Sequence, residues 1–162
     1  MITLCSALIC LLASAQKPSP HQQEAPPLSL NFGMYQAEKA TETYRTFTPV
    51  IESLTASMET QLHRPVDIKL TISKDYSDTI ESLIKGDVDF VRVGPASYVT
   101  AKGRQAGIEL IAMETEGGDK RFKGVVVVRR DNPIKSLADL KGKKFAFGDQ
   151  NSTIGRYLAQ AE

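Results

Sequence analysis

The fold of this chain is decided between residues 66 and 93, which read VDIKLTISKDYSDTIESLIKGDVDFVRV. The first seven of these residues alternate apolar and polar side chains, a pattern typical of a half-buried strand. Asp75 then begins a short helix with one apolar face, and Gly86 is expected at its C-cap. Residues 88–93 predict another strand. Because a helix joins the two strands, the segment predicts parallel pairing in an α/β sheet.

The same alternation of strand and helix extends to both sides. Residues 28–33 predict a first strand. Apolar residues at helical spacing after Thr43 predict a helix that ends before Pro65, and Pro49 is compatible only with its first turn. Further along the chain, the pattern predicts a helix with proline at its first position and then a fourth strand, at residues 95–104 and 108–113. Ligands of such sheets bind at the carboxyl ends of the strands.

A polar stretch at residues 114–121 interrupts this alternation and predicts a hinge between two lobes. Beyond it, the valine-rich residues 124–128 predict a fully buried strand, and residues 145–148 predict another. A short helix is expected between them, framed by Ser136, Asp139 and Gly142. We therefore expect a first α/β lobe over residues 28–115 and the incomplete beginning of a second lobe over residues 116–162.

Residues 1–15, MITLCSALICLLASA, predict a signal peptide that is cut before a proline-rich linker at residues 16–27. The protein is then expected to be periplasmic or otherwise extracytoplasmic. No Lys or Arg precedes the apolar core, which leaves open an atypical signal or a start further upstream. Both cysteines, Cys5 and Cys10, lie in this segment, so no disulfide is expected in the mature protein. Lipid attachment at Cys10 is the lesser alternative, because a bulky residue precedes it.

Composition narrows the classes of function. The chain has 162 residues, of which 41% are hydrophobic and 24% charged, and its formal net charge is +1. Basic and acidic residues are interspersed, so no nucleic-acid partner is expected. The two histidines, His21 and His63, have no metal-like or triad-like partners in the sequence, so neither a metal, a cofactor nor a catalytic group is expected.

An anion-binding pattern stands near the C-terminus, where residues 145–157 read FAFGDQNSTIGRY. Backbone N–H groups in the first turn of a helix lack intrahelical acceptors, and the hydroxyls of Ser152 and Thr153 add donors there. The alternative is a simple helix cap, since Asn, Ser and Thr are common in that role. Tyr76 and Ser97 begin two other helices and are further candidates, although Tyr76 alternatively packs and Ser97 alternatively contacts backbone.

Two more residues lie near the same predicted edge of the sheet. Tyr35 follows the first strand and is a lesser candidate. Arg92 is left out of the predicted site, because a strand residue at that position can face solvent or pair with an acid.

Three blocks, residues 74–76, 86–98 and 136–153, resemble the PhnD-like family, the phosphate-, phosphite- and phosphonate-binding proteins of ABC importers. They occur in that family's order and spacing. The resemblance implies a type 2 periplasmic-binding-protein fold that closes on a phosphorus oxyanion and delivers it to a membrane permease. It also implies a longer protein, with on the order of 100 further residues completing the second lobe.

The family's ligand residues carry over by position. Ser152 and Thr153 match the hydroxyl pair that grips the anion, Asn151 precedes them in the same motif, and Tyr76 matches the tyrosine of the first lobe.

This sequence departs from the family pattern at two positions. Val93 replaces a tyrosine found in some members, and Ile154 replaces a frequent third hydroxyl, so the identity of the anion stays open. An alternative function is the periplasmic sensor domain of a membrane histidine kinase or cyclase. A transferase is disfavoured, since no nucleophile or general base stands out.

Overall fold

The computed structural model describes residues 25–36, 39–115, 117–121 and 123–161. The predicted signal peptide and all but the last three residues of the predicted linker lie outside the described residues. We use the name first lobe for residues 28–115 and the name second-lobe segment for residues 116–161.

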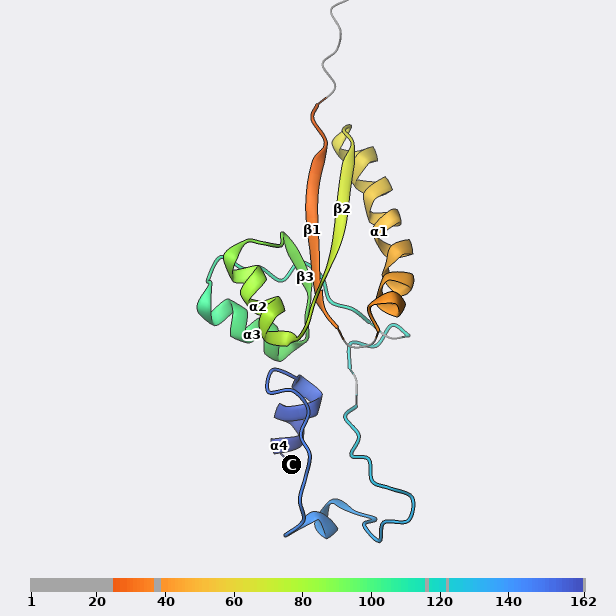
Figure 1. Cartoon of the computed structure of the whole chain (residues 1–162), viewed down its shortest axis with the longest axis vertical. Coiled ribbons are helices and arrows are strands. Elements are labelled where there is room, and N and C mark those ends of the chain that lie inside the picture. The colour runs from red at the N-terminus through yellow and green to blue at the C-terminus, as the bar shows by residue number, and fades with distance from the viewer. Residues whose placement is uncertain (1–24, 37–38, 116, 122, 162) are drawn as a thin grey trace, which may run out of the picture.

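Three parallel strands form the sheet of the first lobe, in the order β2-β1-β3. They are β1 (Leu28–Tyr35), β2 (Val66–Ser73) and β3 (Phe90–Arg92). β1 lies in the middle, as Figure 1 shows, so its backbone is paired on both edges. This parallel arrangement confirms the α/β class that the sequence predicts.

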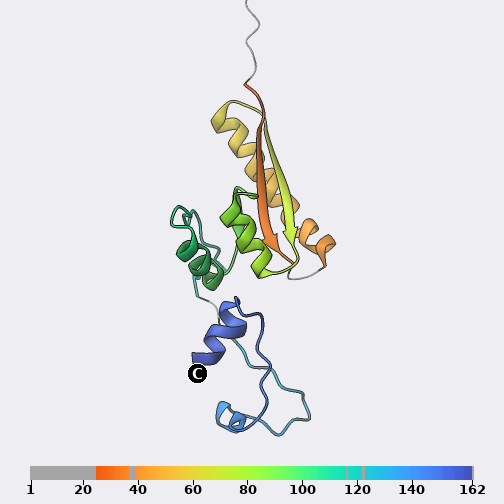
Figure 2. The ribbon, with the colours of Figure 1, turned by 60° about the vertical axis from the view of Figure 1, so that its left-hand side comes forward.

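Helices cover both faces of the sheet. α1 (Ala40–Leu62) lies on one side, and α2 (Tyr76–Lys85) and α3 (Pro95–Arg104) lie on the other (Figures 1 and 2). Between the sheet and α1, the ring of Phe32 stacks on Phe90 at 4.7 Å and meets Phe47 edge-on at 6.3 Å. Val66 and Ile68 of β2 complete this buried core.

The helix signals of the first lobe are confirmed at α2 and α3. The Asp75 side chain caps α2 by accepting from the Asp78 N–H at 2.9 Å, and Gly86 ends it with a φ of 77°. α3 begins with Pro95, as predicted.

Two boundaries differ from prediction. α1 begins at Ala40, so Pro49 lies in its interior and not in its first turn. β3 is shorter than residues 88–93, because Asp89 hydrogen-bonds to the backbone of Asn31 in both directions. The Asn31 N–H donates to Asp89 Oδ2 at 2.7 Å, and the Asp89 N–H donates to the Asn31 carbonyl at 3.0 Å.

The strands expected after α3 are absent from the described residues. Residues 108–113, 124–128 and 145–148 form no ladder there, so these three predictions are wrong for this chain. Val125 and Val127 are 79% and 86% exposed, in contrast to the buried strand expected of them. A strand is stabilised by its hydrogen-bonded neighbours, and the described second-lobe segment supplies none.

Short helical turns are the regular structure of the second-lobe segment. The expected helix at Ser136 is a 3-10 turn, η1 (Leu137–Leu140), closed by a capping box between Ser136 and Asp139. The expected helix after Ser152 is η2 (Thr153–Leu158), a π-helix followed by α4 (Ala159–Ala161). Figure 1 shows the segment running away from the first lobe and returning, so that η2 lies beside the carboxyl ends of the strands. In the part of the chain that is described, no helix is long and apolar enough to cross a membrane.

Candidate functional site

Two tyrosines meet where β1 ends and α2 begins. The rings of Tyr35 and Tyr76 are stacked, with centroids 3.8 Å apart and planes 19° apart. Burial, followed by the neighbouring Tyr76 phenol, raises the pKa of Tyr35 to about 12. The Tyr35 phenol thus keeps its proton to a higher pH than an ordinary tyrosine does.

Arg92 closes the same edge of the sheet and is paired with an acid, as the sequence allowed. Its guanidinium binds both carboxylate oxygens of Glu114, with Nη2 and Oε2 at 2.7 Å, and lies 5.4 Å from the centre of the Phe47 ring. Hydrogen bonding to Glu114 raises the pKa of Arg92, and the same contact lowers the pKa of Glu114. The pair therefore fastens the start of the polar stretch to the end of β3.

The hydroxyl pair of the second-lobe segment faces the first turn of α3. Thr153 Oγ1 accepts a hydrogen bond from the Ala96 N–H at 2.9 Å, and Ser152 Oγ accepts from the Gly155 N–H at 3.0 Å. A hydroxyl that accepts one bond still has its own proton to donate. Among the described residues neither hydroxyl donates a hydrogen bond, and Ser152 acts as the N-cap of η2.

Ser97 and Asn151 are engaged with each other. Ser97 is fully buried, and its hydroxyl donates to the Asn151 carbonyl at 3.3 Å. The Asn151 side-chain amide donates to Ser77 Oγ, in the first turn of α2, at 3.2 Å. These two residues therefore join the lobes directly, and Ser97 is closed to solvent in this arrangement.

The loop that carries the hydroxyls is held tightly. The Gly148 N–H donates to the Gly155 carbonyl at 2.7 Å, and a Cβ added to either glycine would lie 3.1 Å from the α-carbon of the other. Such an approach is tighter than about nine in ten real Cβ contacts, so a larger residue at either position would push the two backbone segments apart.

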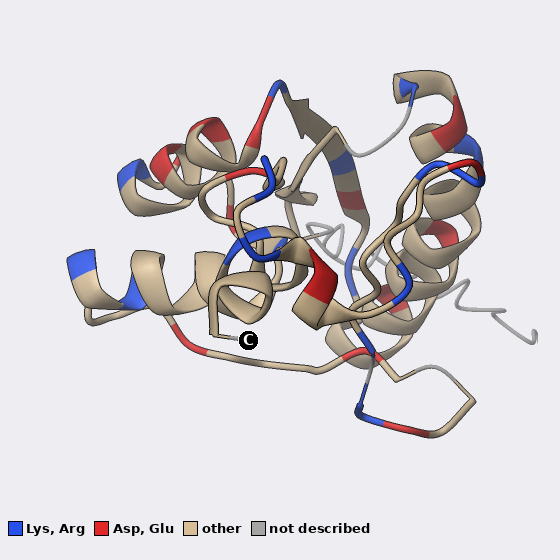
Figure 3. Ribbon diagram, turned by 90° about the horizontal axis from the view of Figure 1, so that it is seen from below, with Lys and Arg blue, Asp and Glu red and all other residues tan. Residues whose placement is uncertain are grey.

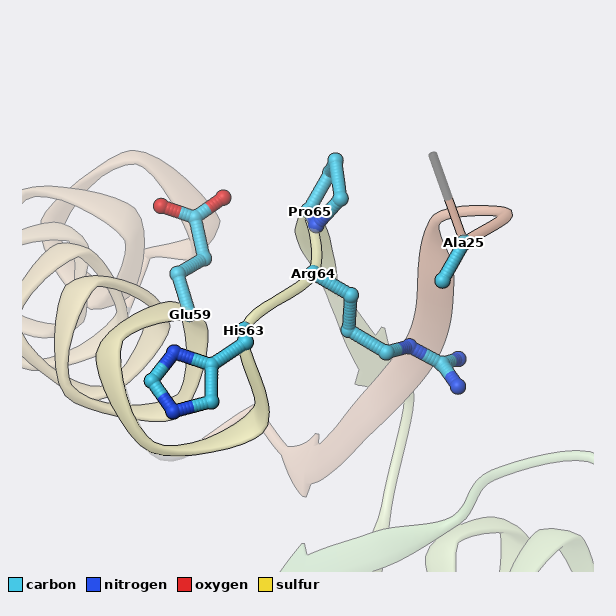
Figure 4. A pocket seen from close by; sticks show the side chains of 5 residues that line it. All are labelled: Ala25, Glu59, His63, Arg64 and Pro65. Carbon is cyan, nitrogen blue, oxygen red and sulfur yellow. The ribbon is translucent and has the colours of Figure 1, made fainter. Parts of the chain in front are cut away.

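Two of the pockets in the described part of the chain lie at opposite ends of the first lobe. The smaller, about 120 Å³, lies between α2, α3 and the loop before η2, and it is lined by Ser77, Ile80, Glu81, Thr100, Arg104, Gln150 and Asn151. The larger, about 370 Å³, lies at the amino ends of the strands (Figure 4) and is lined by Ala25, Glu59, His63, Arg64 and Pro65. It contains none of the predicted site residues. Asn151 is the one predicted residue that lines either of these two pockets.

The charged and potentially metal-binding side chains of the described residues point to no further functional group at this site. Figure 3 shows basic and acidic residues mixed over the helices, in keeping with the interspersed pattern of the sequence. Within the described ranges, no group of three or more His, Cys, Asp or Glu side chains is placed to hold a metal ion.

The six predicted site residues thus fall into two groups around the carboxyl edge of the sheet. One is the tyrosine pair of the first lobe, and the other comprises Ser97, Asn151, Ser152 and Thr153 where the lobes touch. Sequence reasoning missed their partners Ser77 and Ala96. Ser77 adjoins Tyr76 in a helix start and was detectable, whereas a backbone donor such as Ala96 has no sequence signal.

Comparison with known proteins places these features in a family. Residues 32–162 match the family described as the periplasmic substrate-binding protein of phosphonate ABC transporters. The chain is 28% identical over 161 residues to the phosphate-import protein PhnD of Mycolicibacterium smegmatis, an alignment that covers 95% of this chain and 48% of that protein. It is 29% identical over 141 residues to the phosphonates-binding periplasmic protein of Escherichia coli, covering 85% of this chain and 40% of the relative.

A third relative is the probable ABC transporter phosphite binding protein PhnD1 of Prochlorococcus marinus, 30% identical over 110 residues that cover 64% of this chain and 36% of that protein. The chain spans less than half the length of the curated relatives it matches. Because the family match covers residues 32–162, which is most of the sequence, the chain belongs to the family of periplasmic substrate-binding proteins of phosphonate ABC transporters.

Proposed function

We propose that this protein binds a phosphorus oxyanion, which is a phosphonate, phosphate or phosphite, as the extracytoplasmic solute-binding component of an ABC importer. The family match supports the transport role, and the relatives are named for phosphate import and for binding phosphonates or phosphite. The protein partner would be the importer's permease, and the ligand would be released unchanged.

The observation that carries the proposal is the 2.9 Å contact between Thr153 Oγ1 and the Ala96 N–H. It brings the hydroxyl pair of the second-lobe segment to the amino end of α3, where the helix dipole favours negative charge. The Ser152 and Thr153 protons then have a tetrahedral oxyanion as a suitable acceptor.

Affinity requires donors from both lobes. Micromolar binding needs about 8 kcal/mol, and a hydrogen bond to a charged group contributes about 1.5 to 3 kcal/mol. The two hydroxyls alone fall short of that total. Tyr76, which the Tyr35 ring holds in place, is our candidate for a further donor from the first lobe.

The sensor alternative makes a different prediction. A sensor would be followed by a membrane-spanning helix and then by a kinase or cyclase domain, whereas the family match supports an importer component. Reading the coding sequence downstream of residue 162 separates the two.

Calorimetric titration tests the proposal. The protein, as its gene encodes it, is titrated with phosphate, phosphite, methylphosphonate and aminoethylphosphonate. Ser152→Ala and Thr153→Ala should each weaken binding of the preferred anion by about 10- to 150-fold, because each removes one charge-assisted hydrogen bond.

Two controls sharpen the result. Thr153→Ser keeps the hydroxyl and should retain most of the affinity. Ser57→Ala removes a hydroxyl that donates only to the Ser53 carbonyl within α1, so its affinity should equal that of the unaltered protein. Unchanged affinity in both alanine variants at 152 and 153 would remove the basis of the proposed site.

A further inference from the structure

We propose that Ser77, Ser97 and Asn151 form an interlobe clasp, a set of positioning residues that slows ligand release without choosing among ligands. The inference rests on the proposed function, because a clasp serves a protein that retains its ligand between lobes. It assigns Asn151 and Ser97 a role other than contact with the anion.

The clasp engages Asn151 from two helices at once. The backbone carbonyl of Asn151 accepts a hydrogen bond from the Ser97 hydroxyl of α3, and the side-chain amide of Asn151 donates one to the Ser77 hydroxyl of α2. Asn151 is itself fixed within the loop, because its N–H donates to Asp149 Oδ1 at 2.7 Å. A residue held in this way has little freedom to turn toward a ligand.

The hydrogen-bonding roles of these groups also distinguish the clasp from the groups proposed to bind the anion. The Asn151 carbonyl is an acceptor, and an acceptor directed at an oxyanion would repel it. Pairing that carbonyl with the Ser97 hydroxyl removes this repulsion. The neighbouring hydroxyls of Ser152 and Thr153 keep their protons for the ligand.

The two helices that supply the clasp are braced against each other. Arg104 at the end of α3 pairs with Glu81 of α2 through its two terminal guanidinium nitrogens, with Nη2 and Oε2 at 3.1 Å. This ion pair lines the same 120 Å³ pocket as Ser77 and Asn151. The serines on α2 and α3 are thereby kept in fixed relation, so that one asparagine can reach both.

The difference in burial between the two serines predicts which of them slows ligand release more. Ser97 is fully buried, so removing its hydroxyl leaves the half-buried Asn151 backbone carbonyl without its donor. Ser77 is exposed, and water can replace it there.

Ligand dissociation provides the first test. In the protein as its gene encodes it, with phosphate, phosphite and methylphosphonate as ligands, Ser97→Ala should speed dissociation by up to about 12-fold and Ser77→Ala by about 2-fold. The ratios of affinity among the three anions should stay unchanged. Ser77→Thr keeps the hydroxyl and should restore the slow rate. Ser82→Ala is the matched control, because that hydroxyl donates only within α2.

An altered affinity ratio in Ser97→Ala would overturn the inference and make Ser97 a ligand contact. Unchanged dissociation in both serine variants would also overturn it. Failure of the unaltered protein to bind any of the anions would instead count against the proposed function.

Hydrogen exchange tests the clasp without any ligand. The Ala96 N–H lies in the first turn of α3, where it has no intrahelical acceptor, so its protection depends on Thr153 across the lobe boundary. Ser97→Ala should make this amide exchange severalfold faster, and Ser82→Ala should not. Equal protection in the two variants would contradict the clasp whether or not the protein binds an oxyanion.

Discussion

Thr153 joins the first lobe to the second-lobe segment through a single oxygen atom. Its hydroxyl accepts from Ala96 and has a proton left to donate. A lysine at this position would have nothing to accept with, and a carboxylate would have nothing to donate. A hydroxyl is therefore suited to a point where a backbone amide and the proposed anion meet.

Tyr35 provides a prediction about pH. Its phenol should titrate near pH 12 in the folded protein, because burial and the stacked Tyr76 disfavour the tyrosinate. The unfolded chain loses this proton near pH 10.0, the ordinary pKa of tyrosine, so the folded state binds more protons between pH 10 and pH 12. The contribution of Tyr35 to stability is thus fully present below pH 10 and is lost as pH rises toward 12.

Near-ultraviolet titration of tyrosinate in the protein and in Tyr35→Phe measures this effect. The difference between the two curves should show one ionisation near pH 12. A difference curve centred near pH 10 would mean that the phenol is solvated and that the tyrosine stack is loose.

At the scale of elements, α1 has a proline in its interior. Pro49 is exposed in the interior of the helix and has no N–H to donate to the carbonyl of Arg45, four residues earlier. Pro49→Ala restores this donor and should raise the free energy of unfolding by about 1 to 3 kcal/mol. Urea unfolding followed by circular dichroism measures the change.

Pro65 is the matched control for Pro49. It is also exposed but lies between α1 and β2, outside any helix. Pro65→Ala should bring no gain, and it should lower stability slightly by loosening the unfolded chain. Equal effects of the two substitutions would show that Pro49 does not interrupt α1.

The elements that the sequence predicted well are those whose signals are local. Asp75 and Gly86 bound α2 because the side-chain cap and the positive φ are properties of those residues themselves. β1 and β2 follow from the alternation of apolar and polar residues at 28–33 and 66–72, and each strand extends a little beyond it. In contrast, Pro49 led to a wrong prediction for the start of α1, because packing of the apolar face of the helix outweighs one lost hydrogen bond.

The strands that failed are those that depend on distant partners. Residues 124–128 have the composition of a buried strand, but burial needs a neighbouring strand and a covering layer. The described second-lobe segment offers neither. The same holds for the candidate site. The sequence predicts where its helices begin, but it does not predict that Asn151 pairs with Ser77, 74 residues away.

For the whole molecule, an introduced charge should affect stability very differently at an exposed valine of the second-lobe segment and at a buried valine of the first lobe. Val127 is 86% exposed and Val88 is 4% exposed. In this 162-residue chain, Val127→Asp should change the free energy of unfolding by within about 0.5 kcal/mol. Val88→Asp should cost at least about 3 kcal/mol, because it buries a charge under the sheet.

Thermal unfolding of the two variants makes the comparison, with Val127→Ala and Val88→Ala separating loss of volume from gain of charge. A large destabilisation by Val127→Asp would mean that this valine packs in a core that the described contacts do not contain.

β1 is the middle strand of the sheet although it is the earliest described element of the chain. Its backbone partner Asp89 lies 58 residues after Asn31, and a ribosome adds about 5 to 20 residues each second. For roughly 3 to 12 seconds of synthesis, therefore, one edge of the nascent β1 has no native neighbour. Phe32 lacks its stacking partner Phe90 during that interval, so part of the apolar face of β1 stays uncovered while synthesis continues.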